Sequence, residues 1–230
     1  MAMDFNIDEV RTDILKAKEY LGAKHPLCEL EKLGEGTHSK VYRLKSVALK
    51  HLFCGEPPLK QDQITAGEEA IKRKYNFAPY LETMKDPKCK DRNFAFSPCL
   101  DGLRMWDLHA DAMVKNLGAT GMEEYYNNGL GLRSLGFRAD INPSNFIVTP
   151  RAINYIDMFF ETKIDYNPNK VLERLTKAVL WADQVSHCFN IKNNFPEIAD
   201  NMRTALNHFK DNGGALTALT DYETDGTLIL

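Results

Sequence analysis

Residues 31–50 have the sequence EKLGEGTHSKVYRLKSVALK, in which three partly apolar segments alternate with short polar connections. The segments at about 28–33, 41–44 and 47–50 have the composition of β-strands. Because the connections between them are short, the pattern predicts an antiparallel meander. The first connection, Gly34–Lys40, carries two glycines and joins a strand to a strand rather than a strand to a helix.

The sequence on either side of this region has the periodicity of helices. Apolar residues at spacings of three and four predict helices at about 7–21, 62–75, 122–135, 171–189 and 195–209. Weaker strands are predicted at 80–84 and 94–97, around a charged loop, 85–92, that we expect to be a solvated hairpin tip. One further hairpin is predicted from 146–148 and 153–156.

Proline and glycine within residues 97–102 interrupt the periodicity and indicate a domain boundary. We therefore expect four parts: a helical extension at 1–24, a strand-rich lobe at 25–98, a mainly helical lobe at 99–212 and a tail at 213–230. The predicted fold class is α+β.

Composition excludes several functions but selects none. The 230 residues include 29 basic and 32 acidic side chains, for a formal net charge of -3, so we expect no nucleic-acid partner. No apolar run approaches the roughly 20 residues that span a bilayer, and the acidic start lacks a signal core. The five cysteines are odd in number and form no C-x-x-C pair, which is typical of reduced thiols. These features predict a cytoplasmic protein without a membrane partner.

The strand-rich lobe holds the first group of candidate site residues. Glycines at 34 and 36 would let the backbone approach a phosphate closely, although a hairpin turn that binds nothing has the same composition. Lys50 ends the third strand. If that strand pairs under the glycine-containing connection, the Lys50 ammonium would point into the cleft where the phosphate would bind. Glu68 shares the inward face of the next helix and is the better carboxylate partner for Lys50, whereas Glu69 is expected to face solvent.

The helical lobe holds the second group, in the order Asp140, Asn145 and Asp157. Asn145 enters the predicted hairpin and Asp157 leaves it, so the two side chains should meet at its open end. An amide and a carboxylate, completed by phosphates and water, suit Mg²⁺. Asp140 would lie beside them as the base for an attacking hydroxyl. Alternatively, Asp140 and Asn145 shape a proline turn and nothing more.

Five motifs in this order resemble the signature of protein-kinase-like enzymes. They are Gly34-x-Gly36-x-x-Ser39-x-Val41, Val47-Ala48-Leu49-Lys50, Glu68, Asp140-x-x-x-x-Asn145 and Ile156-Asp157. The resemblance extends from about Leu27 to Phe160. It implies a bilobal fold with an antiparallel-sheet N-lobe and a reduced, mainly helical C-lobe.

The resemblance also implies ATP- and Mg²⁺-dependent phosphoryl transfer, with Asp140 and Lys50 as catalytic residues and Asn145 and Asp157 as metal ligands. Phe96 would lie near the gatekeeper position, and the Cys99 N–H would donate to adenine because Pro98 has no N–H. The full set of residues implied to contact the nucleotide is Gly34, Glu35, Gly36, Ser39, Val41, Ala48, Lys50, Glu68, Phe96, Ser97 and Cys99.

Departures from the family pattern separate this chain from a typical member. Arg138-Ala139-Asp140 replaces His-Arg-Asp, which argues against control through an activation-loop phosphate, and Asn142 replaces a common lysine. Asp157 precedes Met158-Phe159 instead of Phe-Gly, and no Ala-Pro-Glu follows. The chain resembles a minimal kinase with a trimmed activation segment, similar to bacterial effectors that are injected into the host cytosol.

Three functions remain open on the sequence. The first is a monomeric protein kinase with a protein substrate, Ser/Thr being the favoured acceptor. A small-molecule phosphotransferase of the aminoglycoside or choline kinase kind shares the Asp-x-x-x-x-Asn loop, but this chain has little room for the acidic insertion that binds cationic substrates. A kinase-like binding module without activity is the third.

Overall fold

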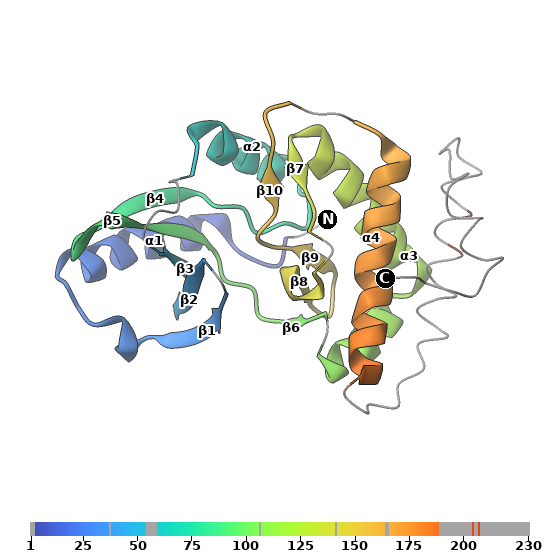
Figure 1. The fold of residues 1–230 in the computed structure, drawn as a ribbon, viewed down its shortest axis with the longest axis horizontal. Helices are drawn as coiled ribbons and strands as arrows, with labels where there is room; N and C mark the ends of the chain where they lie inside the picture. Colours follow the sequence, from blue (N-terminus) through green and yellow to red (C-terminus); the bar gives the residue numbers. More distant parts are fainter. Residues whose placement is uncertain are drawn as a thin grey trace. The chain divides into compact units, whose positions relative to one another are not determined.

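The computed structural model describes residues 3–36, 38–53, 59–105, 107–140, 142–163 and 166–188, together with Thr204 and Asn207. They belong to two compact units, Met1–Asp101 and Gly102–Leu230 (Figure 1). Apart from Thr204 and Asn207, the predicted helix at 195–209 and the tail at 213–230 lie outside the described residues. None of the described helices combines the length and apolar character that a bilayer-spanning segment requires.

The first unit is built on a five-stranded antiparallel sheet with the strand order β1-β2-β3-β5-β4. Its strands are β1 (Glu31–Glu35), β2 (Ser39–Leu44), β3 (Val47–Leu52), β4 (Glu82–Asp86) and β5 (Cys89–Pro98) (Figure 1). The meander predicted from residues 28–50 is confirmed, with one correction at its start. Residues Leu27–Glu29 form a 3-10 turn, η1, so β1 begins at Glu31.

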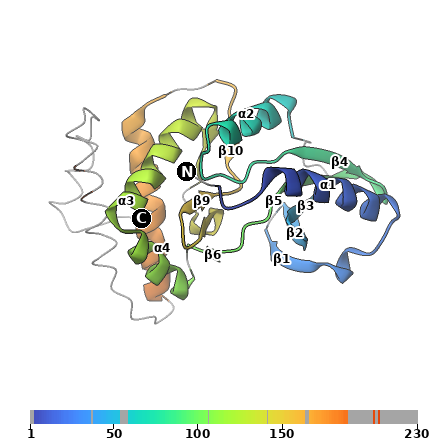
Figure 2. The ribbon, with the colours of Figure 1, turned by 180° about the vertical axis from the view of Figure 1, so that it is seen from behind.

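Helix α1 (Ile7–Gly22) packs on one face of this sheet (Figure 2). The Asn6 side chain caps it by accepting the N–H of Asp8 at 3.1 Å. The apolar stripe predicted from its spacing is buried in one cluster with residues of the sheet and Leu81: Val10, Ile14, Ala17 and Leu21 against Val47, Leu49, Phe94 and Phe96. The helical extension therefore braces the sheet of the first unit.

Helix α2 (Gln61–Lys72) follows β3 and packs closely on the chain that leads into β4. At the contact, a Cβ on Gly67 would lie only 2.6 Å from the Cβ of Pro79. A glycine is therefore required for this approach, and the predicted helix at 62–75 is confirmed with an earlier end.

The hairpin tip predicted at 85–92 is confirmed as the β4–β5 turn, but its loop is shorter than predicted. Strands β4 and β5 run through it and leave only Pro87 and Lys88 as a turn. Charged residues occupy strand positions here because this end of the hairpin is exposed, as at Lys85, Lys90 and Asp91. Asp86 is an exception, since its carboxylate is buried and lies 2.9 Å from Nε2 of His51.

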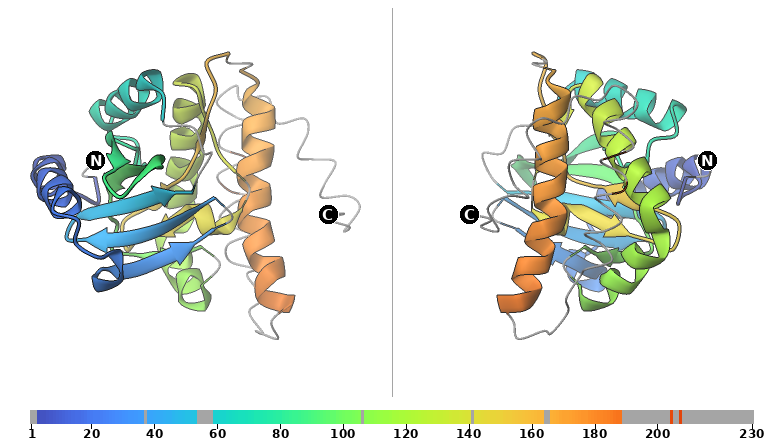
Figure 3. Two further views of the ribbon diagram at one scale, coloured as in Figure 1. Left: turned by 60° about the vertical axis from the view of Figure 1, so that its left-hand side comes forward. Right: turned by 90° about the vertical axis from the view of Figure 1, so that its right-hand side faces the viewer.

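The second unit contains two long helices that lie side by side, α3 (Leu108–Ser134) and α4 (Pro168–Cys188) (Figure 3). Gly118 has a φ of +62° and kinks α3, which begins earlier than the predicted helix at 122–135. A three-stranded sheet, β6-β8-β9, is formed by β6 (Leu103–Arg104), β8 (Phe146–Val148) and β9 (Ile153–Tyr155). The predicted hairpin at 146–156 is its β8–β9 pair.

Three buried tyrosines connect α3 to this sheet and to α4. The hydroxyl of Tyr155 donates to the carbonyl of Tyr125 at 2.5 Å, and the hydroxyl of Tyr125 donates to the carbonyl of Leu175 on α4 at 3.1 Å. Tyr126 and Thr176 share a hydrogen bond of 2.8 Å between their hydroxyls. Burial raises the pKa of all three tyrosine hydroxyls, so they remain protonated.

Candidate functional site

One face of the first unit's sheet gathers several residues predicted to bind a nucleotide. Val41 is paired with Lys50 across β2 and β3, and Ala48 is paired with Ser97 across β3 and β5. Directly paired residues share a face, as do residues two apart in a strand. Val41, Ala48, Lys50 and Ser97 therefore line one face, opposite the face that α1 covers.

Lys50 and its predicted partner lie on different elements of this unit. The Lys50 ammonium is positioned 5.5 Å from the centroid of the Tyr80 ring, within range of a cation–π interaction. The Glu68 carboxylate accepts a hydrogen bond from Nη2 of Arg11 on α1 at 3.3 Å. The side chain of Glu68 is 45% exposed and that of Glu69 is 38% exposed, so burial does not single out Glu68. The Lys50–Glu68 ion pair stays a prediction.

The glycine-containing connection joins β1 to β2, as predicted. Gly34 is paired with Val41 beyond a register shift in β1, and the Gly36 N–H donates to the Ser39 carbonyl at 2.9 Å. The Glu35 carboxylate is held by Lys32 and Lys40, and the Lys32 ammonium is the main cause of its lowered pKa. The Gly36 N–H and the Glu35 carboxylate therefore both have partners within this hairpin.

Two of the predicted adenine contacts need correction. The Phe96 side chain is fully buried in the cluster beneath α1, because Phe96 is paired with Leu49 on the face opposite Lys50. Ala95 and Ser97 are the residues of this part of β5 that share the face of Lys50. The Cys99 N–H donates to the Ser46 carbonyl at 2.8 Å, so it is already used in the sheet.

The second unit brings Asp140 and Asn145 into contact. The side-chain amide of Asn145 donates to Oδ2 of Asp140 at 3.2 Å, and Oδ1 of Asp140 accepts the N–H of Asn142 at 3.4 Å. Asn142 in turn accepts the N–H of Ser144 through its Oδ1 at 3.0 Å. These bonds form around a 3-10 turn, η2 (Pro143–Asn145), which shapes the loop and holds the Asp140 carboxylate by two donors.

Asp157 lies at the end of the β8–β9 hairpin at which Asn145 enters it. The Ile156 N–H donates to the Asn145 carbonyl at 2.9 Å, which places the backbone of Asp157 one residue beyond that bond. Asp157 is exposed and has a φ of +49°, an uncommon left-handed conformation for a residue other than glycine. Such conformations gather at functional sites.

The donor chemistry of Asn145 and Asp157 fits Mg²⁺, which prefers oxygen ligands and retains several waters. The described residues contain no group of three or more His, Cys, Asp or Glu side chains able to hold a metal ion by themselves. A pair consisting of one amide oxygen and one carboxylate would therefore need phosphate oxygens to complete the coordination. The Asn145 amide donates through nitrogen to Asp140, which leaves its oxygen available.

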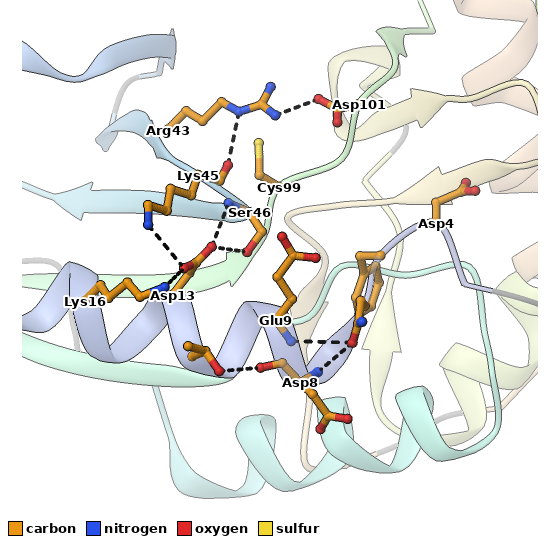
Figure 4. A pocket seen from close by; sticks show the side chains of 13 residues that line it. Asp4, Asp8, Glu9, Asp13, Lys16, Arg43, Lys45, Ser46, Cys99 and Asp101 are labelled. Carbon is orange, nitrogen blue, oxygen red and sulfur yellow. Dashed lines mark hydrogen bonds and ion pairs between the residues drawn. The ribbon is translucent and has the colours of Figure 1, made fainter.

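A pocket of about 820 Å³ in the first unit was not anticipated (Figure 4). It lies between the N-terminal half of α1 and the β2–β3 turn, where the buried Asp13 carboxylate accepts hydrogen bonds from Nζ of Lys16 at 2.8 Å and Oγ of Ser46 at 2.9 Å. Lys16 lowers the pKa of Asp13, although burial opposes this effect. The burial of Asp13 could have been predicted from its spacing, because it lies three residues after Val10 and four before Ala17, inside the apolar stripe of α1.

Comparison with known proteins finds likenesses among solved structures but none at the level of sequence. No protein-family model and no curated protein matches the sequence. The BubR1 kinase domain is similar with a TM-score of 0.42 at 15% identity, over 67% of this chain and 60% of that chain. The Legionella pneumophila Lpg2603 kinase bound to IP6 is similar with a TM-score of 0.44 at 16% identity, over 87% of this chain and 81% of that chain. This chain thus spans less than two thirds of the BubR1 kinase domain.

Proposed function

We propose that this protein is an ATP- and Mg²⁺-dependent phosphotransferase that acts on protein hydroxyl groups, with Ser/Thr as the favoured acceptor. The observation that carries the proposal is the arrangement around Asn145. Its side chain donates to the Asp140 carboxylate, and its carbonyl accepts the N–H of the residue before Asp157. Three oxygen-bearing residues are thereby held at one end of one hairpin.

Asp140 is the candidate base in this arrangement. A carboxylate held by two donors has a fixed orientation, and it can accept the proton of an acceptor hydroxyl as the oxygen attacks phosphorus. Because phosphoryl transfer requires little covalent chemistry from the protein, orientation of the hydroxyl is the main contribution that Asp140 would make.

Asn145 and Asp157 are the candidate metal ligands. Mg²⁺, when bound, neutralises charge on the phosphate oxygens during transfer. The left-handed backbone of Asp157 supports this assignment, because such conformations gather at functional sites.

The nucleotide would be bound by the sheet face that carries Val41, Ala48, Lys50 and Ser97. Val41 and Ala48 offer small apolar surfaces to a base, and Lys50 offers a compact positive charge to the phosphates. The glycine-containing hairpin would contribute backbone N–H groups. We further propose that the protein acts as a monomer in the cytoplasm or, as an effector, in a host cytosol.

The acceptor class can be identified directly. The full chain is incubated with γ-labelled ATP, Mg²⁺ and cell lysate, and phosphorylated residues are located by mass spectrometry. A parallel reaction offers choline and an aminoglycoside. Label on serine or threonine of protein is expected. Label on the small molecules alone would overturn the protein-kinase assignment, and no transfer together with no thermal stabilisation by ATP–Mg²⁺ would overturn nucleotide use.

A further inference from the structure

The second unit contains a cavity of about 240 Å³ whose lining is strongly basic. Its walls come from the C-terminal part of α3, from strand β7 (Phe137–Arg138), from Glu161 after strand β10 (Phe159–Phe160) and from the first turns of α4. Four cationic side chains line it, namely Arg133, Arg138, Lys170 and Arg174, against the single carboxylate of Glu161. This excess of positive charge requires an explanation.

Glu161 can neutralise only part of that charge. Its Oε2 lies 2.8 Å from Nη1 of Arg133, whose side chain is 9% exposed. Its Oε1 lies 3.1 Å from Nε of Arg138, but this buried Nε forms no directed hydrogen bond. One carboxylate thus serves two guanidinium groups, one of them deeply buried and the other incompletely satisfied.

The wall formed by α4 adds two further cations. Lys170 and Arg174 are four residues apart, so they lie on one face of the helix, where like charges repel each other. Among the described residues neither forms an ion pair. The helix also begins at this wall, where the Asn167 side chain accepts the N–H of Asn169 at 3.0 Å, and a helix N-terminus favours negative charge.

We propose that this cavity binds the phosphoryl group of a small phosphate monoester. Guanidinium groups recognise phosphate oxygens through paired N–H donors, and a dianion suits a lining with a formal excess of three positive charges. Phe137, Val171 and Leu175 complete the lining and offer apolar contact to a small carrier. The small volume excludes a large ligand from complete burial.

Occupancy of the cavity has a consequence that rests on the proposed function. Phe159 is paired with Arg138, and Phe160 with Phe137, in the β7–β10 strand pair. Asp140 follows this pair by two residues and Asp157 precedes it by two. A ligand that bridges Arg138 to α4 would therefore hold both candidate active-site residues in place and increase the rate of phosphoryl transfer.

Binding is tested on the full chain by thermal shift and by equilibrium titration with glycerol 3-phosphate and inorganic phosphate, at constant ionic strength set with chloride. Saturable stabilisation is expected. The substitutions Lys170→Gln and Arg174→Gln, both at exposed positions, should each weaken binding by about tenfold, the effect of one charge-assisted hydrogen bond. The matched control Lys163→Gln, exposed outside the cavity, should bind like the parent.

The Lys50→Met variant separates this site from the proposed nucleotide site, because it should bind glycerol 3-phosphate like the parent even if it loses ATP. Absence of saturable binding, or equal binding by the Lys170 and Arg174 variants, would overturn the proposal. Binding of a phosphoserine peptide with blocked ends, without binding of glycerol 3-phosphate, would contradict a small free ligand and indicate a phosphorylated side chain instead. Phosphate binding without any phosphoryl transfer would overturn the proposed function but not the site.

Discussion

Asn145 donates its side-chain amide to the Asp140 carboxylate at 3.2 Å, across the turn that precedes strand β8. The bond connects the candidate base to a candidate metal ligand within five residues. Because Asn145 also accepts the N–H of Ile156, one residue couples both ends of the loop–hairpin segment to each other.

The first prediction concerns this coupling. Asn145→Ala should lower kcat for phosphoryl transfer by about 10²-fold or more, because it removes a proposed metal ligand and a side-chain donor to Asp140. The backbone bond to Ile156 is retained, so the melting temperature should change little. Steady-state kinetics measure the effect. Asn127→Ala, an exposed position on α3, is the control and should retain activity. Equal kcat in the two variants would contradict a role for Asn145 in phosphoryl transfer.

The second prediction concerns Lys50. Lys50→Met should weaken ATP binding by about tenfold or more, because the charge that we propose contacts the phosphates is lost while an unbranched side chain is kept. Isothermal titration with ATP and Mg²⁺ provides the measurement. Lys90→Met changes an exposed lysine on β5 and should bind ATP like the parent. Unchanged ATP affinity in Lys50→Met would contradict the proposal that the phosphates bind at this sheet face.

The third prediction concerns the stability of the first unit. Asp13→Ala should lower the free energy of unfolding by about 2 kcal/mol, since Ser46 and Lys16 lose a buried charged acceptor. Urea denaturation measures the change. Glu19→Ala, exposed on the same helix, should have a much smaller effect. A loss no greater than that of Glu19→Ala would show that Asp13 does not hold α1 to the β2–β3 turn.

The fourth prediction is a pH dependence that arises from His51. Burial lowers the pKa of this imidazole, with Arg92 and Lys40 acting in the same direction and Asp86 opposing them. Between the lowered folded pKa and the unfolded value of about 6.5, the unfolded chain binds more protons, so stability falls as pH decreases below about 6.5. The loss is complete once the pH is below the folded pKa.

The urea midpoints of the parent and of His51→Gln, measured at pH 7.5 and pH 5.5, test this dependence. Glutamine retains a donor for Asp86 but does not titrate, so the midpoint of the variant should fall less on acidification. His109→Gln, exposed on α3, should behave like the parent. An identical pH dependence in His51→Gln and the parent would assign the effect to other groups.

Local pattern predicted much of this fold. The meander at 31–52, the helices α1, α2 and α4 and the β8–β9 hairpin all follow from periodicity over a few residues. The pairing of Val41 with Lys50 and of Ala48 with Ser97 follows from strand alternation once the register is known. The contact between Asp140 and Asn145 is equally local, because both belong to one turn.

What could not be predicted depends on partners that are distant in sequence. Phe96 occupies an alternating strand position, and only the placement of α1 determines that its face is the buried one. The lack of an N–H on Pro98 favours Cys99 as the donor to a ligand, but the partner of the Cys99 N–H is the Ser46 carbonyl, which lies in another hairpin. Strands β4 and β5 extend through charged residues, and one of these, Asp86, is buried against His51, which is 35 residues away.

The most direct measurement is transfer of the γ-phosphoryl group of labelled ATP to protein by the full chain with Mg²⁺, compared with Asp140→Asn and the exposed control Asp91→Asn. The account predicts transfer by the parent and the control, and a rate at least about 10²-fold lower for Asp140→Asn. Transfer at the parental rate by Asp140→Asn, or no transfer by the parent, would contradict it.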